Sequence, residues 1–179
     1  KGERRALGHG QGLIGPGAPW LIGSSLMGMQ VWDNMKGIDV LQSRPDVDPH
    51  RIGCAGYSGG GAQTIWTAAL DTRVSVAVAG GAATFLWYHH GKERDFCICN
   101  VNAGILPLTE MQHVLGLVAP RPFAFVEGRY DNMLPWDLQR ETVRRARRFY
   151  RLFGEDGNIQ HFVTNEWHEM SRAKREAYY

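Results

Sequence analysis

The chain has 179 residues and a formal net charge of +2, with 44% hydrophobic and 21% charged residues. This length and composition predict one soluble globular domain with a sizeable core. The small net charge gives no reason to expect binding to nucleic acid. No apolar stretch approaches the roughly 20 residues that a transmembrane helix needs, so we expect no membrane span.

The predicted strands and helices alternate along the chain, which is typical of a parallel sheet with crossover helices. Residues 1–24 are rich in Gly and Pro and predict mostly loop. A helix over 25–43 follows, with Met35, Ile38 and Leu41 at helical spacing. The next expected elements are a strand over 52–55, a helix over 60–70 and a strand over 74–79.

Residues 80–108 predict a long connection before the second half of the chain. Thr109 and Gln112 then resemble a capping box that opens a short helix to Val118. The last elements are a strand over 123–127, an amphipathic helix over 137–153 with Ala146, Phe149 and Phe153 on its apolar side, and a strand over 160–164.

The most informative motif is Gly56-Tyr57-Ser58-Gly59-Gly60, directly after a predicted strand and before a predicted helix. This Gly-x-Ser-x-Gly pattern is typical of a nucleophile elbow, a sharp strand-to-helix turn that projects a reactive serine. We expect Gly56 and Gly60 to be small because backbone segments pass closely there. The backbone N–H of Gly59 would face an oxyanion formed at Ser58.

A reactive serine needs a base and an acid that orients the base, and their expected chain order here is Ser, Asp or Glu, His. Asp131 falls just past the strand 123–127, and His168 just past the strand 160–164. Because the carboxyl ends of parallel strands meet at one edge of a sheet, we expect both side chains to reach Ser58. His168 would take the proton of Ser58, and Asp131 would hold the imidazole in the correct tautomer.

Other acidic residues and histidines of the chain fit these roles less well. Glu127 and Glu169 are minor alternatives for the acid, whereas Asp137 fits the start of a helix. His161 falls inside a strand and is expected to be structural. The remaining histidines before the serine or within a helix, His9, His50 and His113, do not follow a strand end.

A larger set of motifs resembles one group of known proteins. These are Val31-Trp32-Asp33, Ser43-Arg44-Pro45, Asp48-Pro49-x-Arg51-Ile52-Gly53, Gly56-x-Ser58-Gly59-Gly60-Gly61, Ala119-Pro120-Arg121-Pro122 and Gly128-Arg129-x-Asp131. In this order they resemble the acetyl xylan esterase-like and dienelactone hydrolase-like branch of the α/β-hydrolases. The resemblance implies a three-layer α/β/α domain over 1–179 with a mostly parallel sheet. It also implies a serine esterase that uses Ser58, Asp131 and His168 and no cofactor.

The chain departs from that group in its number of strands, since a complete α/β-hydrolase has about eight and only four are predicted here. Lys1-Gly2-Glu3-Arg4 resembles a segment that follows the fourth strand of such proteins, so we expect the earlier strands and the second oxyanion donor to precede Lys1. The run His9-Gly10-Gln11-Gly12 is a less favoured candidate for that donor. No signal peptide begins this sequence, and a secreted or periplasmic location would need one upstream.

The aromatic residues, the cysteines and the arginine-rich helix give weaker signals. The aromatic residues Tyr57, Trp87 and Tyr88 are candidates for lining a substrate pocket. Cys54 suits a buried strand position, and the spacing of His89, His90, Cys97 and Cys99 is not that of a structural zinc site, so no metal is expected. The arginines of the helix 137–153 are read as a solvated face rather than a nucleic-acid surface.

The sequence therefore predicts a serine carboxylic-ester hydrolase whose substrate is a small-molecule or carbohydrate ester, with acetyl esters implied by the resemblance. A peptidase or thioester hydrolase with the same three residues is the alternative within enzymes. A non-catalytic hydrolase remnant is the alternative outside them. The natural substrate, the oligomeric state and the compartment stay open.

Overall fold

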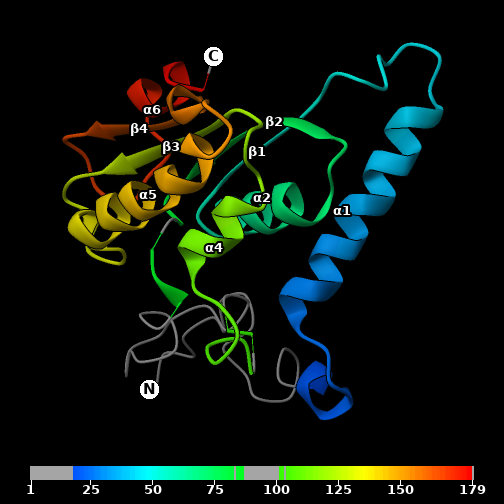
Figure 1. Ribbon diagram of the computed structural model, residues 1–179, viewed down its shortest axis with the longest axis horizontal. Coiled ribbons are helices and arrows are strands. Elements are labelled where there is room, and N and C mark those ends of the chain that lie inside the picture. The colour runs from blue at the N-terminus through cyan, green and yellow to red at the C-terminus, as the bar shows by residue number, and fades with distance from the viewer. Residues whose placement is uncertain (1–17, 83, 87–100, 103, 179) are drawn as a thin grey trace, which may run out of the picture.

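A computed structural model of the chain describes residues 18–82, 84–86, 101–102 and 104–178. Its centre is a parallel four-stranded sheet with the strand order β1-β2-β3-β4 (Figure 1). The strands are β1 Ile52–Tyr57, β2 Val74–Gly80, β3 Phe123–Gly128 and β4 Ile159–Thr164. All four run in the same direction, so their carboxyl ends lie at one edge of the sheet.

Helices follow the strands in the expected alternation. They are α1 Leu26–Ser43, α2 Gly59–Leu70, α4 Met111–Gly116, α5 Trp136–Arg151 and α6 Arg172–Glu176, with short 3-10 turns η1 Ala18–Ile22 and η3 Asp156–Asn158. The helix α2 packs on β1 and β2, α5 packs on β4, and α4 contacts both α2 and α5. With α1 packed on α2, these four helices form one layer against the sheet (Figure 1).

The hydrophobic core lies between this helical layer and the sheet. Its completely buried side chains include Ile65 of α2, Phe125 of β3, Tyr150 of α5 and Ile159 of β4. Burial of such side chains is the main source of stability in a domain of this kind. The core therefore holds β1, β3 and β4 at fixed positions relative to one another.

The opposite face of the sheet is partly exposed within the described part of the chain. Val76 of β2 and Phe162 of β4 are 45% and 42% exposed there. The short helix α6 lies over the carboxyl end of this face, because its Lys174 contacts Tyr57 at the end of β1. The described residues thus form a parallel sheet with helices on its faces, as expected, and α6 is the part of the third layer that they contain.

Most sequence-based boundaries are confirmed within three residues, but some details were wrong. The capping box of α4 is formed by Glu110 and His113 rather than by Thr109 and Gln112, because the backbone turns one residue later. Leu41 and Phe153, assigned to apolar helix faces, are 40% and 58% exposed, because α1 buries only its side towards α2 and α5 ends at Arg151.

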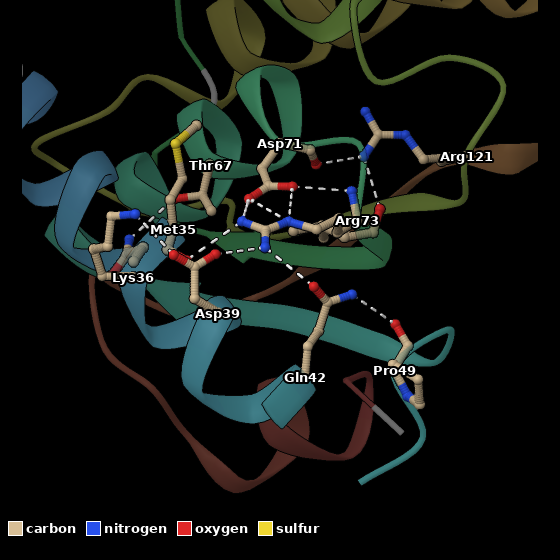
Figure 2. Close-up of polar contacts among 11 residues, drawn as sticks. Met35, Lys36, Asp39, Gln42, Pro49, Thr67, Asp71, Arg73 and Arg121 are labelled. Atoms are coloured by element: carbon tan, nitrogen blue, oxygen red, sulfur yellow. Dashed lines mark hydrogen bonds and ion pairs between the residues drawn. The ribbon is translucent and has the colours of Figure 1, made fainter. Parts of the chain in front are cut away.

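Two arginines tie the helical layer to the strand β2. Arg73, in the turn before β2, donates to both carboxylate oxygens of Asp71 and to Asp39 of α1 (Figure 2). Arg121 donates to the carbonyl oxygens of Ala68 and Val74 at 2.6 and 2.7 Å. The bond to Ala68 satisfies a carbonyl group in the last turn of α2, which lacks a partner within the helix.

None of the helices in the described residues is both long enough and apolar enough to cross a membrane.

Candidate active site

The first component of the site is the turn between β1 and α2. Ser58 occupies this turn with φ 57° and ψ −121°, a left-handed conformation that a residue with a side chain adopts only at an energetic cost. Its N–H donates to the carbonyl of Gly80 at 2.7 Å, and its carbonyl accepts from Ala62 at 3.0 Å. The strained turn is therefore held from both sides, and the serine lies at the N-terminus of α2.

The close approach expected at this turn is present, but only one of the two predicted glycines explains it. A Cβ on Gly56 would lie 2.2 Å from the carbonyl oxygen of Gly60, so no larger residue fits there. A Cβ on Gly60 would meet nothing within 4 Å, so that part of the prediction was wrong. Gly61 is the second constrained position, because its Cβ would lie 2.4 Å from the carbonyl oxygen of Gly80.

The structure brings the three predicted polar residues together at the carboxyl edge of the sheet. The Nε2 of His168 lies 2.8 Å from the Oγ of Ser58, and its Nδ1 lies 2.6 Å from the Oδ2 of Asp131. The side chain of His168 is 15% exposed and that of Asp131 is fully buried. A hydroxyl, an imidazole and a carboxylate thus form one continuous chain of contacts.

Asp131 has two tasks in this arrangement. Its Oδ1 accepts the backbone N–H groups of Met133 and Leu134 at 2.9 and 3.0 Å, which is the turn role that an Asp in a loop usually has. Its Oδ2 faces His168. Burial opposes ionisation, but the hydrogen bond and charge of His168 and the two backbone N–H groups outweigh it and lower the pKa of Asp131 below its ordinary value. The carboxylate is therefore fixed in position and ionised at neutral pH.

The other predicted site residues have mixed outcomes. Gly59 is the first residue of α2, where N–H groups lack partners within the helix. Tyr57 packs its ring 5.2 Å from that of His168, centroid to centroid, and its hydroxyl accepts a hydrogen bond from Lys174 at 3.1 Å. Burial is the main reason that the pKa of Tyr57 is raised. Trp87 and Tyr88 lie outside the described residues.

The competing residues lie in other environments. His161 is in β4 and half-buried. The backbone N–H of His50 donates to the Oδ1 of Asp48, and the Nδ1 of His113 accepts the backbone N–H of Glu110. Cys54 is partly buried against the core, with its Sγ 3.7 Å from the hydroxyl of Thr64.

The two alternative acids also differ from Asp131. Glu169 is exposed. Glu127 is fully buried, and its Oε2 accepts the N–H of Gly81 at 2.9 Å. Neither takes the place of Asp131 at the Nδ1 of His168.

The candidates in the first residues and in the long connection lie outside the described residues. They are His9, His89, His90, Cys97 and Cys99. In the part of the chain that is described, no group of three or more His, Cys, Asp or Glu residues is arranged to hold a metal ion.

Two residues near the site were missed by the sequence analysis. Gly81 has φ +59°, and a Cβ there would lie 2.9 Å from the Cε1 of His168, so only glycine leaves room for the imidazole. Lys174 of α6 is completely buried beside the site. An isolated Gly-Gly pair and a lysine in a charged segment carry no local signal for either role.

Comparisons with known proteins agree with this fold. Residues 29–86, which include the elbow, match the sequence model of the acetyl xylan esterase (AXE1) family. Over 58 residues the chain is 48% identical to the putative hydrolase YtaP of Bacillus subtilis (strain 168). That match covers 32% of this chain and 19% of the relative.

Solved structures extend the similarity over most of the chain. A glucuronoyl esterase from Solibacter usitatus superposes with a TM-score of 0.67 at 18% identity, covering 83% of this chain and 45% of the other. A CE15 glucuronoyl esterase from Caldicellulosiruptor kristjansonii gives 0.72 at 17% identity, with coverage of 87% and 49%. The chain thus spans about half the length of these structures. It has the α/β-hydrolase fold, and its residues 29–86 carry the sequence pattern of the acetyl xylan esterase family.

Proposed function

We propose that the protein is a serine carboxylic-ester hydrolase that works through an acyl-enzyme. The observation that carries the proposal is the chain of contacts from Asp131 through His168 to Ser58, at 2.6 and 2.8 Å. A serine hydroxyl is a weak nucleophile unless an adjacent base takes its proton, and an oriented imidazole supplies that base. The strained turn at Ser58 supports the same role, because such strain is typical of functional positions.

In the first half of the reaction, the Oγ of Ser58 attacks the ester carbonyl while its proton moves to the Nε2 of His168. The backbone N–H of Gly59 donates to the resulting oxyanion. The C–O bond to the alcohol then breaks, and the alcohol leaves with the proton from His168. Asp131 stabilises the transient imidazolium, which its ionised state allows.

In the second half, His168 takes a proton from water, and the resulting hydroxide oxygen attacks the acyl carbon. The bond to Ser58 breaks, the serine regains its proton from His168, and the carboxylic acid leaves. Both halves use only protein groups and water.

For the substrate we propose a carbohydrate ester with a small acyl group such as acetyl. The support is the match of residues 29–86 to a family described as acetyl xylan esterases. Tyr57, next to the nucleophile, would then limit the space on the side of His168. A peptidase or thioesterase would use the same three residues, so the leaving group has to be tested.

The test compares p-nitrophenyl acetate with a peptide p-nitroanilide of similar size. The proposal predicts turnover of the ester that is lost in Ser58→Ala and unchanged in Ser43→Ala, a control at an exposed serine at the end of α1. Faster cleavage of the anilide would favour the peptidase. A folded protein without turnover of either compound would favour a non-catalytic remnant.

A further inference from the structure

Lys174 of α6 is buried in an unusual way. Its side chain is 0% exposed, although a lysine is almost never fully buried without compensating partners. The Nζ donates to the carbonyl of Trp167 at 2.6 Å, to the carbonyl of Glu169 at 2.9 Å and to the hydroxyl of Tyr57 at 3.1 Å. These three bonds use all three donors of an ammonium group.

The three acceptors surround the candidate site. Trp167 and Glu169 are the residues on either side of His168, and Tyr57 directly precedes Ser58. Lys174 therefore joins the loop that carries the base to the turn that carries the nucleophile. Its Nζ also lies 5.2 Å from the centroid of the Tyr57 ring. The ring of His168 packs against the same Tyr57 ring.

Tyr178 makes a second link four residues later in the chain. Its hydroxyl donates to the carbonyl of Gly56 at 2.9 Å. The segment 174–178 thus holds the end of β1 at two successive residues, Gly56 and Tyr57.

The acceptors of Lys174 indicate that it positions a loop rather than pairs with an opposite charge. Among the described residues the hydrogen-bond partners of Lys174 are two carbonyls and a phenol, and its charge contributes to lowering the pKa of Glu166 without forming an ion pair with it. A buried charge adds little net stability, and an apolar side chain of similar volume is often as stable or more stable in its place. A cation that instead bonds the carbonyl groups of the residues before and after one histidine restricts the backbone around that histidine.

We infer that Lys174 is a positioning residue, which keeps His168 at hydrogen-bond distance from Ser58 by fixing the His168 loop to Tyr57. The inference rests on the proposed function for its kinetic consequences. The hydrogen bonds of Lys174 go neither to the hydroxyl of Ser58 nor to the ring of His168, so we expect its loss to lower kcat and leave KM unaltered. Because a displacement of about 1 Å at a reacting group costs on the order of 100-fold in rate, we expect a 10- to 100-fold decrease in kcat.

The test is Lys174→Met, which keeps an unbranched apolar side chain and removes the three donors. Its matched control is Arg175→Met, which removes one positive charge from the exposed side of the same helix. Two quantities are measured on folded protein: kcat and KM with p-nitrophenyl acetate, and the imidazole 15N spectrum of His168, assigned with His168→Gln. The spectrum reports whether Nε2 keeps its hydrogen bond to Ser58 and Nδ1 its hydrogen bond to Asp131, which a purely structural role of Lys174 would not change.

The inference predicts a lower kcat at constant KM and an altered His168 spectrum in Lys174→Met, with Arg175→Met like the wild type. A folded Lys174→Met with wild-type kcat and an unchanged spectrum would overturn it. If Lys174→Met does not fold, Tyr57→Phe tests the inference instead, since it removes one acceptor of Lys174 and leaves the other two. An unchanged His168 spectrum and an unchanged kcat in Tyr57→Phe would overturn the inference too. A wild type without turnover would refute the proposed esterase, while the spectra would still show whether Lys174 positions His168.

Discussion

The Nε2 of His168 lies 2.8 Å from the Oγ of Ser58, although 110 positions of sequence separate the two residues. The contact exists because β1 and β4 run in the same direction and end at the same edge of the sheet, with Ser58 and His168 in the turns that follow. The buried strands β2 and β3 between them set the separation. The geometry of the site is thus a consequence of the core, and variants can test the two separately.

Asp131→Asn tests the electrostatic part of the site. The amide keeps an oxygen for the backbone N–H groups of Met133 and Leu134, so the turn should survive. The substitution also removes the negative charge beside His168. With the amide oxygen on the backbone N–H groups, the NH2 group faces the Nδ1 of His168, which favours the wrong tautomer. We expect kcat for p-nitrophenyl acetate to fall by about 10⁴-fold, as for the same exchange in other Ser-His-Asp sites.

The control for this variant is Asp137→Asn, an exposed acid in the first turn of α5 that should leave kcat unchanged. If Asp131→Asn retained more than a tenth of the wild-type kcat, the carboxylate would have only its turn role.

Gly56→Ala and Gly60→Ala test the packing of the elbow. A Cβ at Gly56 would lie 2.2 Å from the backbone oxygen of Gly60, which cannot move without shifting α2. We expect a loss of roughly 1–3 kcal/mol in the free energy of unfolding, or more. A Cβ at Gly60 meets nothing within 4 Å, and alanine is favoured over glycine in a helix by up to about 1 kcal/mol. Gly60→Ala should therefore not lower the free energy of unfolding.

Urea unfolding of both variants measures the difference. Equal destabilisation by the two substitutions would show that the elbow is not packed as described.

His161 predicts a specific pH dependence of stability. Burial, aided by the charges of Arg140 and Arg147, lowers the pKa of His161 from 6.5 to about 4 in the folded protein. The unfolded chain therefore binds a proton between pH 6.5 and 4 that the folded protein does not, so stability decreases as the pH falls through this window. The loss attributable to His161 is on the order of 3 kcal/mol by pH 4.

His161→Phe removes the titrating group and keeps an aromatic ring in β4. Unfolding free energies measured at pH 7, 5.5 and 4 should therefore fall less steeply in the variant than in the wild type. Parallel pH dependences would mean that His161 takes up its proton in the folded protein as readily as in the unfolded chain.

Some features could be predicted from the sequence because their signals are local. The strand, turn and helix around Ser58 are encoded within about 20 consecutive residues, and the strand-end positions of Asp131 and His168 follow from two short apolar runs. The contact between them needed only one further step, that parallel strands end at one edge of a sheet. Whether these contacts perform catalysis stays a prediction.

Other features depend on contacts between distant segments, which local patterns do not encode. Gly60 and Gly61 are adjacent and identical in sequence, and only the approach of the Gly80 carbonyl makes Gly61 the constrained one. The segment 171–176 consists mostly of charged residues, yet Lys174 is buried, and its acceptor Tyr57 lies 117 positions earlier, where no local pattern could indicate it. Likewise, Glu110 caps α4 in place of Thr109 because the tertiary path of the chain sets where the helix begins.

The most direct test of the central claim is mass spectrometric mapping of a fluorophosphonate adduct on the folded protein. Such reagents phosphonylate a serine only when a neighbouring base activates its hydroxyl. The account predicts one adduct, on Ser58, that is absent in Ser58→Ala and forms much more slowly in His168→Gln. A folded protein that remains unlabelled, or that is labelled at the same rate without His168, would contradict it.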